Sequence, residues 1–222
     1  MRVFVSIFFI CLTMQGQNIA VNLGDFSNVK IFSGLEVTYH ESSENKLEIS
    51  GNLKEYVNWK ISKDMLRISM DVTKVFKDHN VKINLYLKKV PILLDLNEGV
   101  KFTLSDSFKG LYSEIKVQEG AEFHGRLALD SAKFKSITGG QIVVSGHVED
   151  YDCYLNTGGL FDAYELSASK ASIVALAGGE ANVFVDKILD VEVKIGGIVN
   201  YKGVPEILET NKLLGGTINA KN

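Results

Sequence analysis

The sequence has few of the residues on which disulfides, proline-rich linkers and metal sites depend. Among its 222 residues are two cysteines, two prolines, one tryptophan and four histidines. Cys11 lies in an apolar N-terminal stretch, and removal of that stretch would leave Cys153 alone. We therefore expect no intramolecular disulfide, and stability must come from packing and strand pairing. A lone cysteine at a core-facing position behaves as a small hydrophobic residue.

The histidines lack the spacing that a metal site requires. Each is isolated, with no second histidine or cysteine at ligand spacing. They are His40, His79, His124 and His147. We expect neither a metal nor a cofactor.

Charge of one sign is also lacking. The formal net charge is −3, spread along the chain rather than gathered in blocks, so no surface for nucleic acid or an anionic membrane is predicted. The 45% content of hydrophobic residues excludes a disordered chain. Twenty glycines, with β-branched and aromatic residues in short alternating runs, favour strands joined by tight turns over helices.

Only one long apolar run is present, at residues 3–14, and it is too short to span a bilayer. It has the form of a signal peptide, which we predict at residues 1–16 with cleavage after Gly16. The mature protein would then be exported to the periplasm, the cell surface or the medium. A buried first strand is the alternative. Lipid attachment at Cys11 is less favoured, because residues 8–10 are larger than those of a lipoprotein signal.

Glycine positions reveal a repeat along the rest of the chain. The repeat is marked by Gly99, Gly120, Gly139, Gly158, Gly178, Gly196 and Gly215. The intervals are 21, 19, 19, 20, 18 and 19 residues, and the last five marks are Gly-Gly pairs. A regular period of this length is typical of a solenoid.

Side chains around these marks fall into matching columns. Three residues after the marks stand Phe102, Phe123, Ile142, Phe161, Ala181, Val199 and Ile218. Five residues before them stand Leu94, Ile115, Phe134, Cys153, Ile173 and Val191. Apolar columns at odd offsets, separated by outward polar residues, have the alternation of strands. The pattern predicts an all-β fold, with a parallel β-solenoid of about seven coils over residues 91–222.

Each glycine is expected at a corner between two strands. The chain turns there with φ above zero, and we expect a Cβ to collide with the neighbouring coils. The residue before the glycine changes from Glu98 and Glu119 in the first coils to Ile195 and Leu214 in the last. The corner is therefore predicted to face solvent in the first coils and to be closed off from solvent in the later coils.

Residues 17–90 are predicted to form a founding coil and an antiparallel β cap, in one structural unit with the solenoid. Residues 29–39 fit the coil template. Four further alternating segments follow, at residues 47–49, 57–61, 66–70 and 81–87. Lys63-Asp64 reads as a hairpin turn, and Trp59 is expected to pack in the cap rather than to stack on a ligand. The cap would shield the first edge of the solenoid.

Two stretches of the chain resemble a known family. They are "FSNVKIFSGLEVTYHESSENKLEISG" and "NTGGLFDAYELSASKASIVALAGGEANVFVDKILDVEVKIGGIVNYKGVPEIL", the second with a Tyr-x-Gly-x-Pro segment at Tyr201, Gly203 and Pro205. The chain is similar here to the putative auto-transporter adhesins with a head GIN domain, from Bacteroidetes cell envelopes. The resemblance covers nearly all of the mature chain and implies a right-handed β-helix with an exported, adhesin-like role. Gly-Gly stands where Gly-Ala-Gly-Asp is common in the family, so acidic rows near the corners are thinner.

The predicted function is that of a binding or scaffolding protein of the cell envelope, with a glycan or an envelope protein as partner. A β-helix carbohydrate-active enzyme, a polysaccharide lyase or glycosidase, is the alternative. Two carboxylates roughly 5 to 9 Å apart would suit glycoside cleavage, and four acidic residues lie near the same corners: Asp150, Asp152, Asp162 and Glu165.

Chance neighbours on a solvated face explain these carboxylates better, because 27 acidic residues are spread over the chain. No serine is presented at a strand-to-helix elbow. We predict a non-enzyme and assign no catalytic, metal or ligand-binding residue. The last coil has no evident cap, so copies of the chain are expected to pair through solenoid ends or edges.

Overall fold

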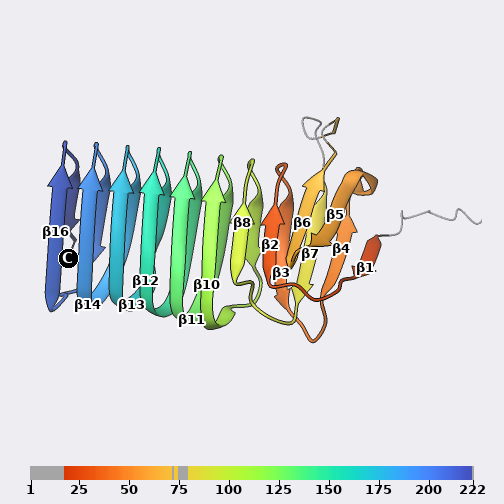
Figure 1. Cartoon of the computed structure of the whole chain (residues 1–222), viewed down its shortest axis with the longest axis horizontal. Coiled ribbons are helices and arrows are strands. Elements are labelled where there is room, and N and C mark those ends of the chain that lie inside the picture. Colours follow the sequence, from red (N-terminus) through yellow and green to blue (C-terminus); the bar gives the residue numbers. More distant parts are fainter. Residues whose placement is uncertain (1–17, 72, 75–79, 222) are drawn as a thin grey trace, which may run out of the picture.

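The computed structural model describes residues 18–71, 73–74 and 80–221, so the predicted signal peptide, Cys11 and His79 lie outside the described residues. Within these ranges seventeen strands form one continuous sheet, and a single 3-10 turn, Lys54–Tyr56, is the only helical segment. The sheet winds into a right-handed parallel β-helix, with the N-terminal strands at one end of the rod (Figure 1). The predicted all-β solenoid is confirmed.

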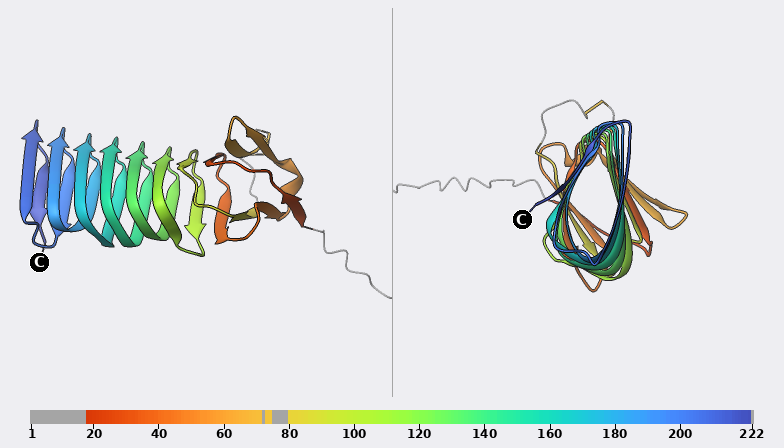
Figure 2. Two further views of the ribbon diagram at one scale, coloured as in Figure 1. Left: turned by 60° about the horizontal axis from the view of Figure 1, so that its bottom comes forward. Right: turned by 90° about the vertical axis from the view of Figure 1, so that its left-hand side faces the viewer.

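The N-terminal strands are β1 (Ile19–Asn22), β2 (Asn28–Ile31), β3 (Glu36–Glu41), β4 (Lys46–Ser50), β5 (Val57–Ser62), β6 (Met65–Met70) and β7 (Lys82–Leu87). The solenoid continues with β8 (Leu93–Leu96), β9 (Lys101–Leu104), β10 (Phe108–Gln118), β11 (Glu122–Ile137), β12 (Gln141–Asn156), β13 (Leu160–Leu176), β14 (Glu180–Lys194), β15 (Ile198–Lys202), β16 (Ile207–Leu213) and β17 (Thr217–Ala220). Strands β11 to β14 pass round the bend opposite the glycine corners, so each lies on both faces of a flattened coil (Figure 2).

The strand register places repeated positions directly over one another. Phe123 pairs with Phe102 on one side and with Ile142 on the other, and Ile142 pairs with Phe161. The same column continues through Ala181, Val199 and Ile218. The predicted columns are therefore confirmed. They form one hydrophobic core along the rod, in which each fully buried large side chain contributes about 1.5–3 kcal/mol.

The glycine corners are two-residue β-turns. At one corner Glu119 and Gly120 have φ of 58° and 72°, and the Ala121 N–H donates to the Gln118 carbonyl at 3.2 Å. Two consecutive positive φ values and this hydrogen bond define a type I′ turn. The solenoid repeats the pair of positive φ values at 98–99, 119–120, 138–139, 157–158, 177–178, 195–196 and 214–215. These seven corners match the predicted coils.

Adjacent corners are joined by hydrogen bonds, and the two glycines of a Gly-Gly pair are required for different reasons. The Gly139 N–H donates to the Thr157 carbonyl at 3.1 Å, so the ladder between coils runs through the turns. A Cβ on Gly158, the first glycine of a pair, would meet nothing within 4 Å, so the positive φ alone requires it. A Cβ on Gly159, the second, would collide with the Ser136 carbonyl oxygen of the preceding coil. The expected collision therefore belongs to the second glycine.

The prediction that the corner closes in the later coils is wrong. The residue before the first glycine is exposed in all seven coils. Ile195 is 59% exposed and Leu214 is 76% exposed. The turn projects from the end of the flattened coil, where no other element covers it (Figure 1).

The N-terminal part adds coils in an order that differs from the sequence. Strands β2 and β3 form the predicted founding coil and pair in parallel with β8 and β9. On their other side they pair in parallel with β6 and β7, which were expected in an antiparallel sheet. The antiparallel pairings of the cap are β4 with β7, β5 with β6 and β1 with β4. Lys63 and Asp64 form the predicted hairpin turn, with φ of 50° and 61°, and Trp59 packs against the core as expected.

The last described coil is polar where the others are apolar. Strand β16 is exposed along its length. Two of its inward positions are Thr210, paired with Val191, and Lys212, paired with Val193. A charged residue at an inward position opposes pairing with another sheet edge. Pairing of copies through ends or edges stays a prediction, and Lys212 weighs against it at this edge.

The two glycines of one corner should differ in their tolerance of alanine. Gly158→Ala places a side chain in the left-handed region with free space around it, and should lower the free energy of unfolding by about 1–2 kcal/mol. Gly159→Ala forces Cβ against the Ser136 carbonyl, and should lower it by about 3 kcal/mol or more. Urea denaturation of the two variants measures both values. An equal or smaller loss for Gly159→Ala would contradict the corner geometry.

Removal of the Tyr151 hydroxyl should stabilise the protein. The side chain is 1% exposed between Phe134 and Phe161, and its hydroxyl has no hydrogen-bond partner among the described residues. Burial raises the pKa of Tyr151 well above its usual value of 10. Tyr151→Phe should raise the free energy of unfolding by about 1–3 kcal/mol, because it removes a buried unpaired polar group. Tyr154→Phe on the outer face is the control, with a change within about 0.5 kcal/mol. A clear loss of stability in Tyr151→Phe would count against the unpaired hydroxyl.

Candidate functional site

The segment that joins β7 to β8 crosses the side of the rod, because the coils are not stacked in sequence order. The β2–β3 coil lies between the β6–β7 coil and the β8–β9 coil. The chain must therefore return past the founding coil before β8 can begin. Residues 88–92 make this return and border two hollows.

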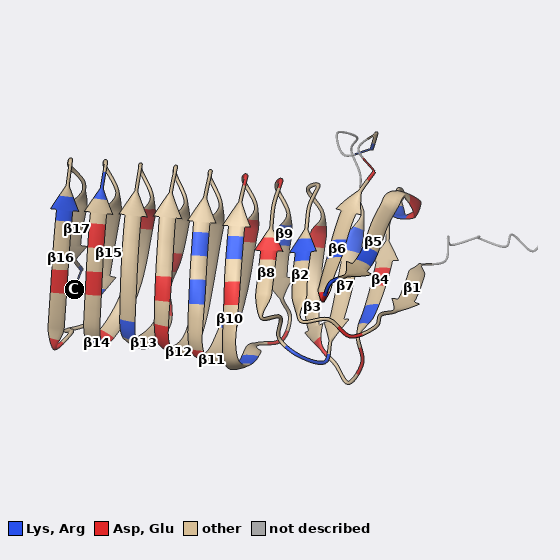
Figure 3. Ribbon diagram, viewed as in Figure 1, with Lys and Arg blue, Asp and Glu red and all other residues tan. Residues whose placement is uncertain are grey.

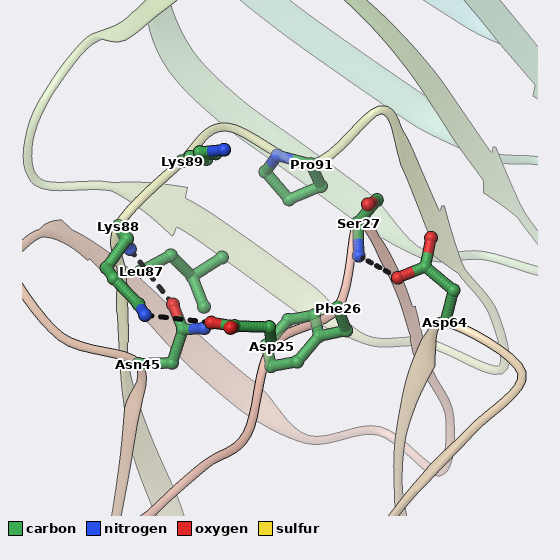
Figure 4. Close-up of a pocket in the computed structure, with 9 residues that line it drawn as sticks. All are labelled: Asp25, Phe26, Ser27, Asn45, Asp64, Leu87, Lys88, Lys89 and Pro91. Carbon is green, nitrogen blue, oxygen red and sulfur yellow. Dashed lines mark hydrogen bonds and ion pairs between the residues drawn. The ribbon is translucent and has the colours of Figure 1, made fainter.

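The first hollow has a volume of about 320 Å³ and lies between the return segment and the chain that enters β2 (Figure 4). Lys88 Nζ lies 2.8 Å from Asp25 Oδ1, and the Lys88 N–H donates to Asn45 Oδ1 at 3.0 Å. Asn45 Nδ2 in turn donates to the Gly24 carbonyl at 3.1 Å. Because these polar groups are bonded to one another, the first hollow is a junction that fixes the return segment.

The second hollow has a volume of about 480 Å³ and lies on the other side of the return segment, where strand β10 begins. Its lining includes Ile92, Leu111 and Tyr112, whose side chains are 54%, 76% and 40% exposed. All other exposed large hydrophobic side chains among the described residues lie at position 195 or beyond. A hollow that gathers exposed apolar side chains is the default position for a binding site.

Local backbone geometry explains why these apolar side chains point outward. Phe108 is fully buried and packs edge-on against Tyr39, with ring centroids 4.8 Å apart. Residues 109–112 are then all exposed, so the alternation of β10 is interrupted before it resumes at Ser113. Tyr39 lines the second hollow from within the core, and burial raises the pKa of its hydroxyl to about 12.

A third hollow of about 260 Å³ adjoins the second, and Tyr112 lines both. It also contains Ser131, Lys133, Asp150 and Asp152. Burial, and then the carboxylates of Glu114 and Asp152, raise the pKa of the Tyr112 hydroxyl. Tyr112 therefore shares this hollow with the carboxylates of Asp150 and Asp152. We call the second and third hollows together the lateral groove.

The four carboxylates singled out in the sequence do not converge. Asp150 and Asp152 lie on the outer face of β12 and line the lateral groove. Glu165 lines a separate hollow, together with His124. Asp162 pairs in register with Val143 and Asn182, away from the lateral groove.

The histidines lie apart in the part of the chain that the structure describes. His40 stacks on Tyr86, with centroids 4.8 Å apart, and His147 Nδ1 lies 3.0 Å from Ser167 Oγ. Within the described ranges no group of three His, Cys, Asp or Glu side chains could hold a metal ion, and no helix is long and apolar enough to cross a membrane. Cys153 is buried, and burial raises the pKa of its thiol, as fits a small hydrophobic residue.

Comparison with known families and structures identifies this architecture. The model of the family described as "putative auto-transporter adhesin, head GIN domain" matches residues 25–205. The chain belongs to this family. No curated protein sequence matches it.

Three solved structures share the fold of this family member. A putative adhesin from Bacteroides fragilis has a TM-score of 0.85 at 16% identity, over 92% of this chain and 96% of that chain. A putative adhesin from Parabacteroides distasonis has a TM-score of 0.71 at 18% identity, over 92% and 96% of the two chains. A protein described as a putative lipid binding protein, from the same species, has a TM-score of 0.66 at 20% identity, over 93% and 96%.

The pattern of residues in the sequence did not predict the lateral groove. A partial signal is the pair Leu111 and Tyr112, two adjacent large side chains that cannot both point inward in a regular strand. The position of Ile92 beside them has no counterpart in the repeat, because it depends on the return segment.

The junction at the first hollow should depend on Asn45 and hardly on Asp25. Asn45 is 8% exposed, and Asn45→Ala removes two side-chain hydrogen bonds, one to Lys88 of the return segment and one to Gly24 in the chain that enters β2. We expect the free energy of unfolding to fall by about 1–3 kcal/mol. Asp25→Asn removes an exposed ion pair and should leave urea stability unchanged within error. A larger loss for Asp25→Asn would show that the ion pair is the main link.

Proposed function

We propose that this family member is an exported, adhesin-like binding protein of the bacterial cell envelope that holds a glycan or an envelope protein and does not catalyse a reaction. The lateral groove carries the proposal, because it gathers exposed apolar side chains next to charged and hydroxyl groups on one side of the rod. Family membership and the adhesin descriptions of the similar structures support it. The apolar run at residues 3–14 supports export.

The scaffold suits binding without conformational change. Strands β11 and β12, which bear most of the third hollow, are paired along both edges there, and Tyr112 of β10 is paired in register with Ser131 of β11. Side chains on such strands are held at a fixed spacing. A rigid site loses little conformational entropy when a ligand binds.

The arrangement of carboxylates favours binding over glycoside cleavage. Asp150 and Asp152 are two residues apart on one strand and lie on the same face of it. Hydrolysis of a glycosidic bond typically uses two carboxyl groups that flank the bond. Asp162 and Glu165, which could have completed such a pair, lie outside the lateral groove. The carbohydrate-active enzyme is therefore the weaker candidate.

Binding can be tested with the purified chain on a glycan array and, in parallel, on detergent-solubilised envelope proteins. We expect saturable binding in at least one of these two tests. Absence of binding in both would contradict the proposed function. Heat-denatured protein serves as the control for non-specific adsorption.

Absence of catalysis can be tested by incubating the chain with neutral polysaccharides and polyuronides and measuring the release of reducing ends. We expect no release above the buffer rate. Release that is abolished by Asp152→Asn or Asp162→Asn would show that the protein is an enzyme.

A further inference from the structure

We infer that the ligand of the lateral groove is a neutral, extended glycan, and that Tyr112 is the platform on which a sugar ring stacks. This inference rests on the proposed binding function and specifies the ligand class and the site.

The direction of the groove favours an elongated ligand. Tyr112 pairs in register with Ser131, and Ser131 pairs with Asp150. Each step crosses one coil, which is about 4.8 Å along the rod. The groove therefore runs along the rod axis, at right angles to the strands. An extended chain of pyranose rings advances by a comparable distance per sugar, so successive sugars would meet successive coils.

The side chains of the groove match the chemistry of a sugar. A pyranose ring presents carbon-bound hydrogens on its faces, and these pack on an aromatic ring such as Tyr112, which is 40% exposed beside Leu111. Sugar hydroxyls both donate and accept hydrogen bonds. The carboxylates of Asp150 and Asp152 accept such bonds, and the Lys133 ammonium group donates them. The second hollow therefore supplies apolar contacts, and the third hollow beside it supplies hydrogen-bonding groups.

The charges of the groove balance, which favours a neutral ligand. Among the described residues, Lys88 pairs with Asp25 at 2.8 Å, and Lys109 pairs with Glu41 at 3.3 Å. Two lysines, Lys89 and Lys133, then stand against two acids, Asp150 and Asp152. Residues of both signs are also interspersed over the strands of the rod (Figure 3). A polyanion would be attracted by an excess of positive charge, which this groove lacks.

Other ligand classes fit less well. A peptide added as a strand needs a free sheet edge, and β11 and β12, which bear Ser131, Lys133, Asp150 and Asp152, are paired along both edges beside the third hollow. Strand β10 pairs with β8 only at residues 114–117, so a peptide could add only at residues 108–113 of β10, away from these polar side chains. An acyl chain needs an enclosed apolar cavity, whereas Leu111 is 76% exposed and Ile92 is 54% exposed. A glycan chain tolerates an open groove, because most of its surface stays hydrated.

Calorimetric titration of the purified full chain with neutral oligosaccharides tests the inference. The probes are cellohexaose, laminarihexaose and maltohexaose, with polygalacturonate and phosphatidylglycerol vesicles as the anionic and lipid arms. We expect at least one neutral oligosaccharide to bind. Its affinity should change little between about 0.05 M and about 0.5 M salt, because no net charge is neutralised.

Variants locate the site. Tyr112→Ala and Leu111→Ala should each weaken binding, Tyr112→Ala by about tenfold or more, while Tyr112→Phe should stay within about twofold of the parent. Tyr164→Ala is the matched control, because Tyr164 is an outward tyrosine outside the lateral groove and stacks with Lys202 at 4.4 Å. It should bind like the parent. Circular dichroism of each variant checks that the fold persists.

Each contrary result has a distinct meaning. Equal glycan affinity in the parent and in Tyr112→Ala would overturn the site and leave the binding function in place. Binding only to polygalacturonate, to the vesicles or to an envelope protein would overturn the ligand class. Failure to bind any neutral oligosaccharide would overturn the inference, whereas the proposed function would be overturned only if the chain also bound nothing on the glycan array and no solubilised envelope protein.

Discussion

Hydrogen bonding between successive coils is the constraint on which the rest of the structure depends. Each coil of the solenoid is too short to bury its own side chains, so it must pair with its neighbours at every position, including the corners. The bonds from the Gly139 N–H to the Thr157 carbonyl and from the Gly158 N–H to the Ala177 carbonyl show that the ladder continues through these turns. The seven corners share one pair of positive φ values, and the interval between them stays within 18 to 21 residues. From Gly139 on, the residue after the turn is a second glycine, and at Gly159 a Cβ would collide with the preceding coil. The glycine period is a consequence of that ladder.

The same ladder makes the surface of the rod a regular support. Outward side chains of successive coils stand in line, as in the row Asn182, Asn200 and Asn219, whose amide groups are joined by hydrogen bonds of 2.9 Å. Inward side chains form the core, and the aromatic rings of Phe134 and Phe161 lie 4.8 Å apart. Departures from this regularity are local. They include register shifts between β12 and β13 and between β13 and β14. Two others, the return segment that crosses the rod and the start of β10, border the lateral groove.

The irregular part of the rod, formed by the return segment and the start of β10, explains how proteins with a common fold can have different binding surfaces. The corner turns and core columns contribute stability and contain little that could select a ligand. The return segment and the start of β10 bear Ile92, Leu111 and Tyr112, which the repeat does not need. Structures that share this fold at 16–20% identity can therefore keep the ladder and differ at this edge.

The amino-acid sequence by itself determined the coils, because alternation and a near-constant interval encode which side chains are buried and which positions stack. The column of Phe123, Ile142 and Phe161 follows because each of these residues lies three positions after a corner glycine. The tertiary structure alone decided that the β6–β7 coil is added outside the founding coil, and that Gly159 rather than Gly158 makes the close approach. It also brought Ile92 beside Tyr112 and moved Asp162 away from Asp150. These placements depend on contacts between segments that have no periodic relation, and a pattern of burial contains no information about them.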